Sequence, residues 1–158
     1  MSSSVRLRDV SRADLPLMFE FQLDPDFNQM AMTKPRNAEV FAAHWERILG
    51  NPKSNAKAIV INDELAGVMS CFEMNGLDVV GSWIGREFWG REIATRALEL
   101  LLSEVSIRPL HARVATSNAG SLRVLQKCGF VIERVQLSPE DDRYPECEEA
   151  ILILNVEP

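Results

Sequence analysis

The chain has 158 residues, enough for one domain, and its 46% hydrophobic and 25% charged residues are typical of a globular protein rather than a disordered one. A formal charge of −6 argues against broad binding to a nucleic-acid backbone and leaves room for an amine-bearing substrate. The sequence contains neither a run of 18 apolar residues nor the apolar core of a signal peptide, so we expect a cytoplasmic protein that does not bind membranes.

The first half of the chain begins with a strand and helices. Residues 5–10 alternate as a short strand, and the capping residues and early proline at 11–16 predict the start of a helix. Apolar residues at helical spacing predict a second helix over 38–49. Three apolar segments joined by tight turns, one of them the hairpin dipeptide Asn75-Gly76, then predict an antiparallel meander. These segments are 56–61, 65–74 and 77–84.

The second half predicts a crossover between parallel strands. The strand at 77–84 runs through a Gly-containing turn into a helix that begins near Ile93 and ends near Arg108, before Pro109. The next segment, 110–116, alternates as a strand, so strand, helix and strand form a parallel unit. The remaining predicted elements are a helix at about 120–128 and strands at 130–137 and 149–156.

The turn at Gly90 has the features of a phosphate site. A helix that starts directly after a strand exposes backbone N–H groups at its positive end, and a glycine lets a ligand approach the backbone. Arg86, Arg91 and Arg96 add positive charge nearby. The alternative is that Gly90 only forms a tight turn.

A second motif, NAGSLRVLQKCGF at 118–130, follows the predicted parallel strand. Together with FWGREIATRA at 88–97, it resembles the GNAT superfamily of acyl-CoA-dependent N-acetyltransferases, and most of all its RimJ/RimL branch. The resemblance implies a single GNAT domain over 1–158 with an α/β (α+β) fold. Its sheet would be mixed and mostly antiparallel, with six to seven strands, a central parallel pair and about four flanking helices.

The resemblance also implies the ligands. Acetyl-CoA would be the acyl donor, the acceptor would be a primary amine on a small molecule or a peptide N-terminus, and no metal would take part. Homodimers are compatible with it. The residues implied in CoA binding are Trp83, Ile84, Gly85, Arg86, Gly90, Arg91, Glu92, Ile93, Ala94, Thr95, Asn118, Ser121 and Lys127.

The chain departs from the family pattern at two places. Glu92 replaces the second glycine of the turn, where its charge would repel a pyrophosphate unless the side chain turns outward. Val79 and Ser82 occupy positions where the branch often has a Glu and a Tyr, so the usual general base is missing. These departures support an alternative function, a degenerate module that binds acyl-CoA or a protein partner without turnover.

Catalysis needs an acid for the departing thiolate. Many relatives use a Tyr at the position of Leu125, so the resemblance points instead to Ser121, whose alternative role is to cap or pack the helix start. Tyr144 is a second candidate that could also be a packed loop residue. It lies in the acidic segment 139–149, which we interpret as a solvated loop or an electrostatic funnel.

Other polar residues are weaker candidates. Glu73 is either a base or an exposed strand carboxylate. His44 and His111 have no partner at metal-ligand spacing, so we assign both a structural role.

Overall fold

The computed structural model describes residues 4–90 and 92–156 of the chain. The strands are β1 (Val5–Asp9), β2 (Asn55–Ile61), β3 (Glu64–Met74), β4 (Leu77–Ile84), β5 (Leu110–Ala115), β6 (Val131–Ser138) and β7 (Cys147–Leu154). The α-helices are α1 (Leu15–Gln22), α2 (Pro25–Ala31), α3 (Ala38–Leu49), α4 (Ile93–Glu104) and α5 (Ala119–Lys127), and the 3₁₀ turns are η1 (Arg12–Asp14) and η2 (Arg86–Phe88).

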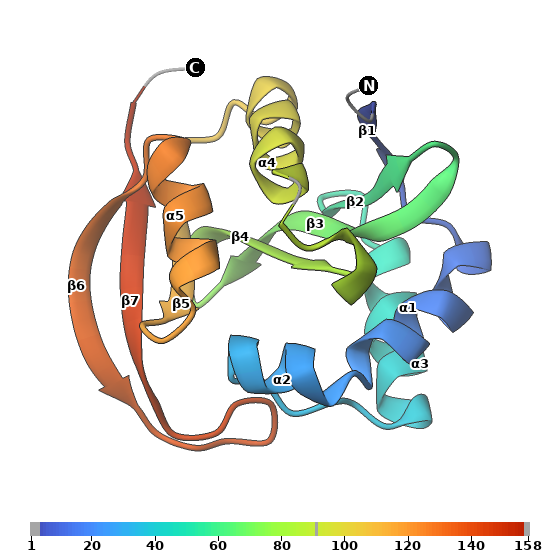
Figure 1. The fold of residues 1–158 in the computed structure, drawn as a ribbon, viewed down its shortest axis with the longest axis horizontal. Coiled ribbons are helices and arrows are strands. Elements are labelled where there is room, and N and C mark those ends of the chain that lie inside the picture. Colours follow the sequence, from blue (N-terminus) through green and yellow to red (C-terminus); the bar gives the residue numbers. More distant parts are fainter. Residues whose placement is uncertain (1–3, 91, 157–158) are drawn as a thin grey trace.

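The seven strands form one sheet in the order β1-β2-β3-β4-β5-β7-β6 (Figure 1). Neighbouring strands are antiparallel except β4 and β5, which α4 connects. The mixed sheet with a central parallel pair, and the crossover that produces it, are therefore confirmed.

Side-chain alternation along β2 separates the core into two layers. Ile59 and Ile61 pack with the apolar face of α4, whereas Ala58 and Val60 pack with Met18 of α1 and Trp45 of α3. A strand sends successive side chains to opposite faces of its sheet, so one apolar segment supplies both layers. The helices accordingly cover both faces of the sheet (Figure 1).

Two details of the helices differ from the sequence prediction. The short helix α2 was not predicted, although Asp24 caps it by accepting a hydrogen bond from the Asp26 N–H and Pro25 occupies its first turn. Helix α4 ends at Glu104, before the position near Arg108 that Pro109 suggested. Among the described residues, no helix is long and apolar enough to span a membrane.

The parallel pair separates along its length. Residues of β4 and β5 align at one position, Val79 with His111, whereas β3 and β4 pair along the whole of β4. The carboxyl-terminal half of β4 is therefore held from one side, by β3. The other edge of β4 faces away from β3, toward β5 (Figure 1).

Gly67 allows β3 to hold this end of β4. It aligns with Ile84, and a Cβ atom at Gly67 would lie 2.3 Å from the Trp83 carbonyl oxygen and 3.0 Å from the Ile84 Cα. Both contacts are with backbone, so the strands themselves would have to move apart.

Gly67→Ala should therefore lower the free energy of unfolding by about 2–4 kcal/mol, because the added methyl group overlaps the backbone of β4. Urea unfolding followed by circular dichroism measures the change. Gly120→Ala is the control: its Cβ would lie 3.9 Å from the Asn118 Oδ1 within helix α5, so stability should rise by up to about 1 kcal/mol. Equal stability of Gly67→Ala and the parent protein would contradict this role.

Candidate active site

A cleft of about 1600 Å³ opens where β4 and β5 separate. Its walls come from β4, β5, the starts of α4 and α5, helices α2 and α3, and the loop between β6 and β7. Most of the residues predicted from the sequence line it. They are Trp83, Ile84, Gly90, Glu92, Ile93, Ala94, Thr95, Asn118, Ser121, Lys127 and Tyr144.

The β4 edge presents backbone groups to this cleft. The Trp83 carbonyl points toward β3, and the Gly85 N–H donates to the Ala66 carbonyl 2.7 Å away. Peptide groups alternate in direction along a strand, so the N–H groups of Ser82 and Ile84 point the other way, toward β5. The indole of Trp89 donates to the Ile84 carbonyl at 2.8 Å and fixes this end of the strand.

Two residues in the turn before α4 have a left-handed backbone conformation. Gly90 has φ 79° and Glu92, the N-cap residue, has φ 59°. Only glycine adopts this region without steric cost, which explains why a second glycine suits position 92. A Cβ atom at Gly90 would meet nothing within 4 Å among the described atoms, so a ligand can approach the backbone there. The predicted Arg91 lies outside the described residues.

Helix α4 directs its N-terminus into the cleft. Its first intrahelical bond at this end runs from the Arg96 N–H to the Glu92 carbonyl, so the N–H groups of Ile93, Ala94 and Thr95 precede the helical ladder. These three residues line the cleft. Unpaired N–H groups at the positive end of a helix dipole attract anions.

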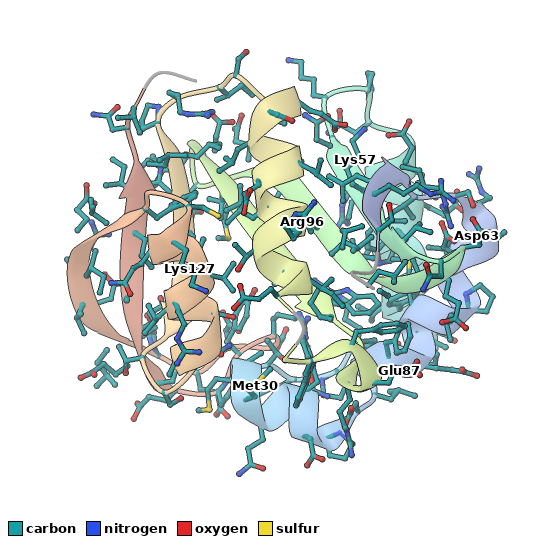
Figure 2. All side chains as sticks on the ribbon, turned by 45° about the horizontal axis from the view of Figure 1, so that its top comes forward. Met30, Lys57, Asp63, Glu87, Arg96 and Lys127 are labelled. Carbon is teal, nitrogen blue, oxygen red and sulfur yellow. The ribbon has the colours of Figure 1, made fainter. Side chains whose placement is uncertain are left out.

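Glu92 forms an ion pair with Lys127 across the two helix ends. The Lys127 ammonium lies 3.0 and 3.1 Å from the two carboxylate oxygens, and it reaches from α5 toward α4 (Figure 2). Hydrogen bonds from Lys127 lower the pKa of Glu92, so this carboxylate is charged at neutral pH. Glu92 therefore engages a cation that the family resemblance implies in CoA binding.

The structure does not bring two of the predicted residues into the cleft. The guanidinium of Arg86 is paired with Asp24 at the start of α2, 2.5 Å away, and with Asp26. Gly85 is buried against the ring of Phe21. Neither Gly85 nor Arg86 belongs to the described lining, so their proposed part in CoA binding has no support from their positions.

Asn118, rather than Ser121, caps helix α5. The Asn118 Oδ1 accepts a hydrogen bond from the Ser121 N–H at 3.2 Å, and Asn118 is buried. Ser121 is half-buried on the cleft wall, at the third residue of the helix. The Ser121 hydroxyl is therefore not the cap of this helix, and its role as an acid stays a prediction.

The loop between β6 and β7 closes one side of the cleft. Asp141 accepts hydrogen bonds from the N–H groups of Arg143 and Tyr144, at 2.8 and 2.7 Å. The Lys34 N–H donates to the Arg143 carbonyl at 2.7 Å, and the Arg143 guanidinium donates to the Lys34 carbonyl. The loop is thereby joined to the segment before α3, and Tyr144, 43% exposed, lines the cleft.

His44 lies on the cleft wall contributed by α3, where sequence reasoning gave it only a structural role. Its ring packs edge-on against Trp45, and its Nδ1 lies 3.3 Å from the Arg47 guanidinium. Burial, together with the positive charges of nearby arginines, lowers the pKa of His44 to about 4. His44 is therefore neutral at neutral pH.

Other candidates occupy less distinctive positions. Glu73 is exposed on β3 at the cleft wall, as expected of a strand carboxylate, and His111 is buried in β5. Within residues 4–90 and 92–156, no group of three or more His, Cys, Asp and Glu side chains is placed to hold a metal ion.

The His44 pKa predicts a pH-dependent stability. The unfolded histidine titrates near pH 6.5, so between about pH 6.5 and 4 the unfolded chain binds a proton that the folded chain does not. Acidification through this window therefore destabilises the fold. His44→Gln should lose less free energy of unfolding than the parent between pH 6.5 and 4, measured by urea unfolding. Between pH 7 and 8 the free energy of unfolding should change with pH equally in both proteins. An identical pH dependence over the whole range would contradict the depressed pKa.

Solved structures resemble this chain over nearly its full length. A spermidine N-acetyltransferase from Vibrio cholerae, solved with CoA and spermine, has a TM-score of 0.80 at 16% identity, covering 96% of this chain and 95% of that protein. RimL, a ribosomal L7/L12 alpha-N-protein acetyltransferase solved with CoA, has a TM-score of 0.81 at 17% identity, covering 98% and 96%. The microcin C7 self-immunity acetyltransferase MccE, solved with acetyl-CoA and AMP, has a TM-score of 0.78 at 20% identity, covering 96% and 92%.

These identities are low, and they establish a common fold. A search of curated protein sequences found no match. The family comparison is more direct: residues 4–131 match the acetyltransferase (GNAT) domain. That match spans the sheet from β1 to the start of β6, including both helix starts that line the cleft. The chain therefore belongs to the GNAT acetyltransferase family.

Proposed function

We propose that the protein transfers an acetyl group from acetyl-CoA to a primary amine by direct attack in a ternary complex. The observation that carries the proposal is the arrangement of one cleft. The cleft contains the N-terminus of α4, which suits a pyrophosphate. It also contains the edge of β4 that faces β5, which suits an extended amide-containing chain.

The reaction needs few protein groups. The neutral amine attacks the thioester carbonyl carbon, the C–S bond breaks, and the thiolate takes a proton while the nitrogen loses one. The Ile84 N–H, which faces β5, is positioned to donate to the carbonyl oxygen as negative charge develops. Strand alternation favours Ile84 over Trp83 as this donor.

Ser121 and Tyr144 are the candidates for protonating the thiolate. Both line the cleft, one on α5 and the other on the loop between β6 and β7. Since Asn118 caps α5, the Ser121 hydroxyl is not needed for that purpose. We favour Ser121 as the acid.

The acceptor is a primary amine. The relatives named above act on spermidine and on a ribosomal protein, so small molecules and peptide N-termini both fit the fold. A homodimer and a cytoplasmic location remain predictions of the sequence.

The alternative function, binding without turnover, is tested directly. Thiol release from acetyl-CoA across a panel of primary amines measures turnover, and calorimetry with CoA measures binding. Release above the rate of hydrolysis supports the transferase. Micromolar CoA binding with no release for any amine would favour the binding module.

Glu92→Gln should tighten CoA binding severalfold at low salt, because it removes a negative charge near the α4 N-terminus and frees Lys127. Calorimetry at two salt concentrations checks this, and the gain should shrink as salt rises. In a Lys127→Ala background the same substitution should increase the CoA affinity less, because part of the effect depends on the charge of Lys127. Unchanged affinity at low salt would show that Glu92 lies outside the reach of the phosphates.

Ser121→Ala should lower kcat by on the order of 100-fold with little change in KM for acetyl-CoA, because a proton donor acts mainly in the transition state. Its thermal stability should match the parent, since the cap is Asn118. The matched control is Ser103→Ala on the outside of α4, which should keep full activity. Full activity of Ser121→Ala would rule out Ser121 as the acid. Tyr144→Phe would then be the variant to measure.

A further inference from the structure

Three arginines from separate segments line the cleft together: Arg36 before α3, Arg47 on α3, and Arg143 in the loop between β6 and β7. We call them the arginine cluster. His44 lies among them, 3.3 Å from the Arg47 guanidinium. The hydrogen bonds between Lys34 and Arg143 hold the loop against the segment that carries Arg36.

The cluster lacks carboxylate partners in the described part of the chain. Elsewhere Arg8, Arg12 and Arg86 form ion pairs at 2.8, 2.8 and 2.5 Å, but none of the three cluster guanidiniums is in an ion pair among residues 4–90 and 92–156. The nearby carboxylate of Asp141 accepts hydrogen bonds from the backbone of its own loop. Arg143 donates to the Lys34 carbonyl and interacts with the charge of Asp141, so within the described residues the positive charge of the cluster is only partly compensated.

Holding these cations together opposes folding. Arg36 and Arg143 are half-buried, and burial lowers the pKa of each guanidinium. The positive charge of Arg143 lowers the pKa of Arg36 further, and all three arginines help to lower that of His44. A protein gains no stability from such a group of like charges, whereas an anion would find a partly desolvated site already formed, with Arg47 exposed at its rim.

The remaining polar groups suit an oxyanion. Guanidinium groups bind carboxylates and phosphates through parallel hydrogen bonds. Because Arg47 donates to Nδ1 of His44, the proton of the neutral imidazole is placed on Nε2, which then serves as a further donor. Gln22 holds the backbone of Arg36 from both sides, accepting from its N–H at 2.8 Å and donating to its carbonyl at 2.9 Å.

We propose that the arginine cluster is the acceptor subsite and that it binds a carboxylate or phosphate group carried by the amine substrate. This inference rests on the amine acetylation proposed above and narrows its substrate class. Although the chain has a net charge of −6, its cleft is locally cationic on this side. The acidic loop contributes Arg143 to the cleft, and its Glu140 pairs with Lys34 at 2.9 Å.

The first test uses His44 as a reporter and does not require turnover. The sequence contains two histidines, so His44→Gln assigns the His44 resonance by difference in an NMR titration. Inorganic phosphate, added to protein saturated with CoA, should raise the His44 pKa by about one unit or more by neutralising the arginines around it. Arg36→Gln should raise the pKa without phosphate and should reduce the response to phosphate. An unchanged pKa in the parent protein would overturn the proposal.

The second test compares matched acceptors in acetyl transfer. Comparing phosphoethanolamine with ethanolamine tests recognition of a phosphate group. Comparing Ala-Asp-Ala amide with Ala-Asn-Ala amide tests recognition of a carboxylate. In at least one pair, the anionic member should have a kcat/KM about 10- to 100-fold higher. Arg36→Gln should lose most of that preference without loss of stability, because its backbone bonds to Gln22 are kept. Arg134→Gln, on the outside of β6, is the matched control and should keep the preference.

Equal rates within both pairs would overturn the subsite. A response of His44 to phosphate without acetylation of any amine would instead contradict the proposed transferase and leave an anion site in place. The two failures are therefore distinguishable.

Discussion

The separation of β4 from β5 is the constraint on which the rest of the structure depends. A parallel pair that stayed aligned would consume both edges of β4 in hydrogen bonds. Here the strands align only at Val79 and His111, and the carboxyl-terminal half of β4 is supported by β3 alone. Close support from β3 requires Gly67, whose missing side chain lets the two backbones meet at Trp83. The sheet thus gains a cleft while its core remains closed.

The same separation positions the helix that follows. The chain leaves β4, passes the η2 turn, and enters α4 through two residues in the left-handed region, Gly90 and Glu92. The helix that follows has its positive end at the cleft. Glu92 adopts this conformation at a steric cost that glycine would avoid, and its ion pair with Lys127 offsets part of that cost.

Much of the fold could be predicted from the sequence because it is encoded locally. Apolar alternation, the Asn75-Gly76 turn and the helical spacing after Ile93 each specify an element within a few residues. The missed helix α2 is short and has few apolar residues, and its signal lay in the capping dipeptide Asp24-Pro25. The positions of the α4 and α5 starts could be predicted for the same reason, since each follows a strand after a short connection.

The acceptor side could not be predicted, because it is assembled from distant segments. Arg36 and Arg143 are separated by more than a hundred residues and, like Arg47, belong to no shared motif, so only the tertiary fold brings the three into one cleft. Arg86 shows the converse, since it is close in sequence to the turn at Gly90 but is paired with Asp24 at the start of α2. The role of Gly67 could not be predicted from the sequence either, because it depends on the close approach of the β4 backbone on the neighbouring strand.

Net charge and local charge lead to opposite expectations for the acceptor. A formal charge of −6 favours the approach of cations over long distances, but this attraction is screened within about 10 Å at moderate salt. Contacts inside the cleft are shorter and less hydrated, so the few groups that line it decide which ligand is held. In this protein several surface carboxylates are paired with lysines and arginines, whereas the half-buried side chains of Arg36 and Arg143 line the cleft. Selection of the acceptor therefore follows the arginines, and the acidic surface affects mainly the rate of encounter.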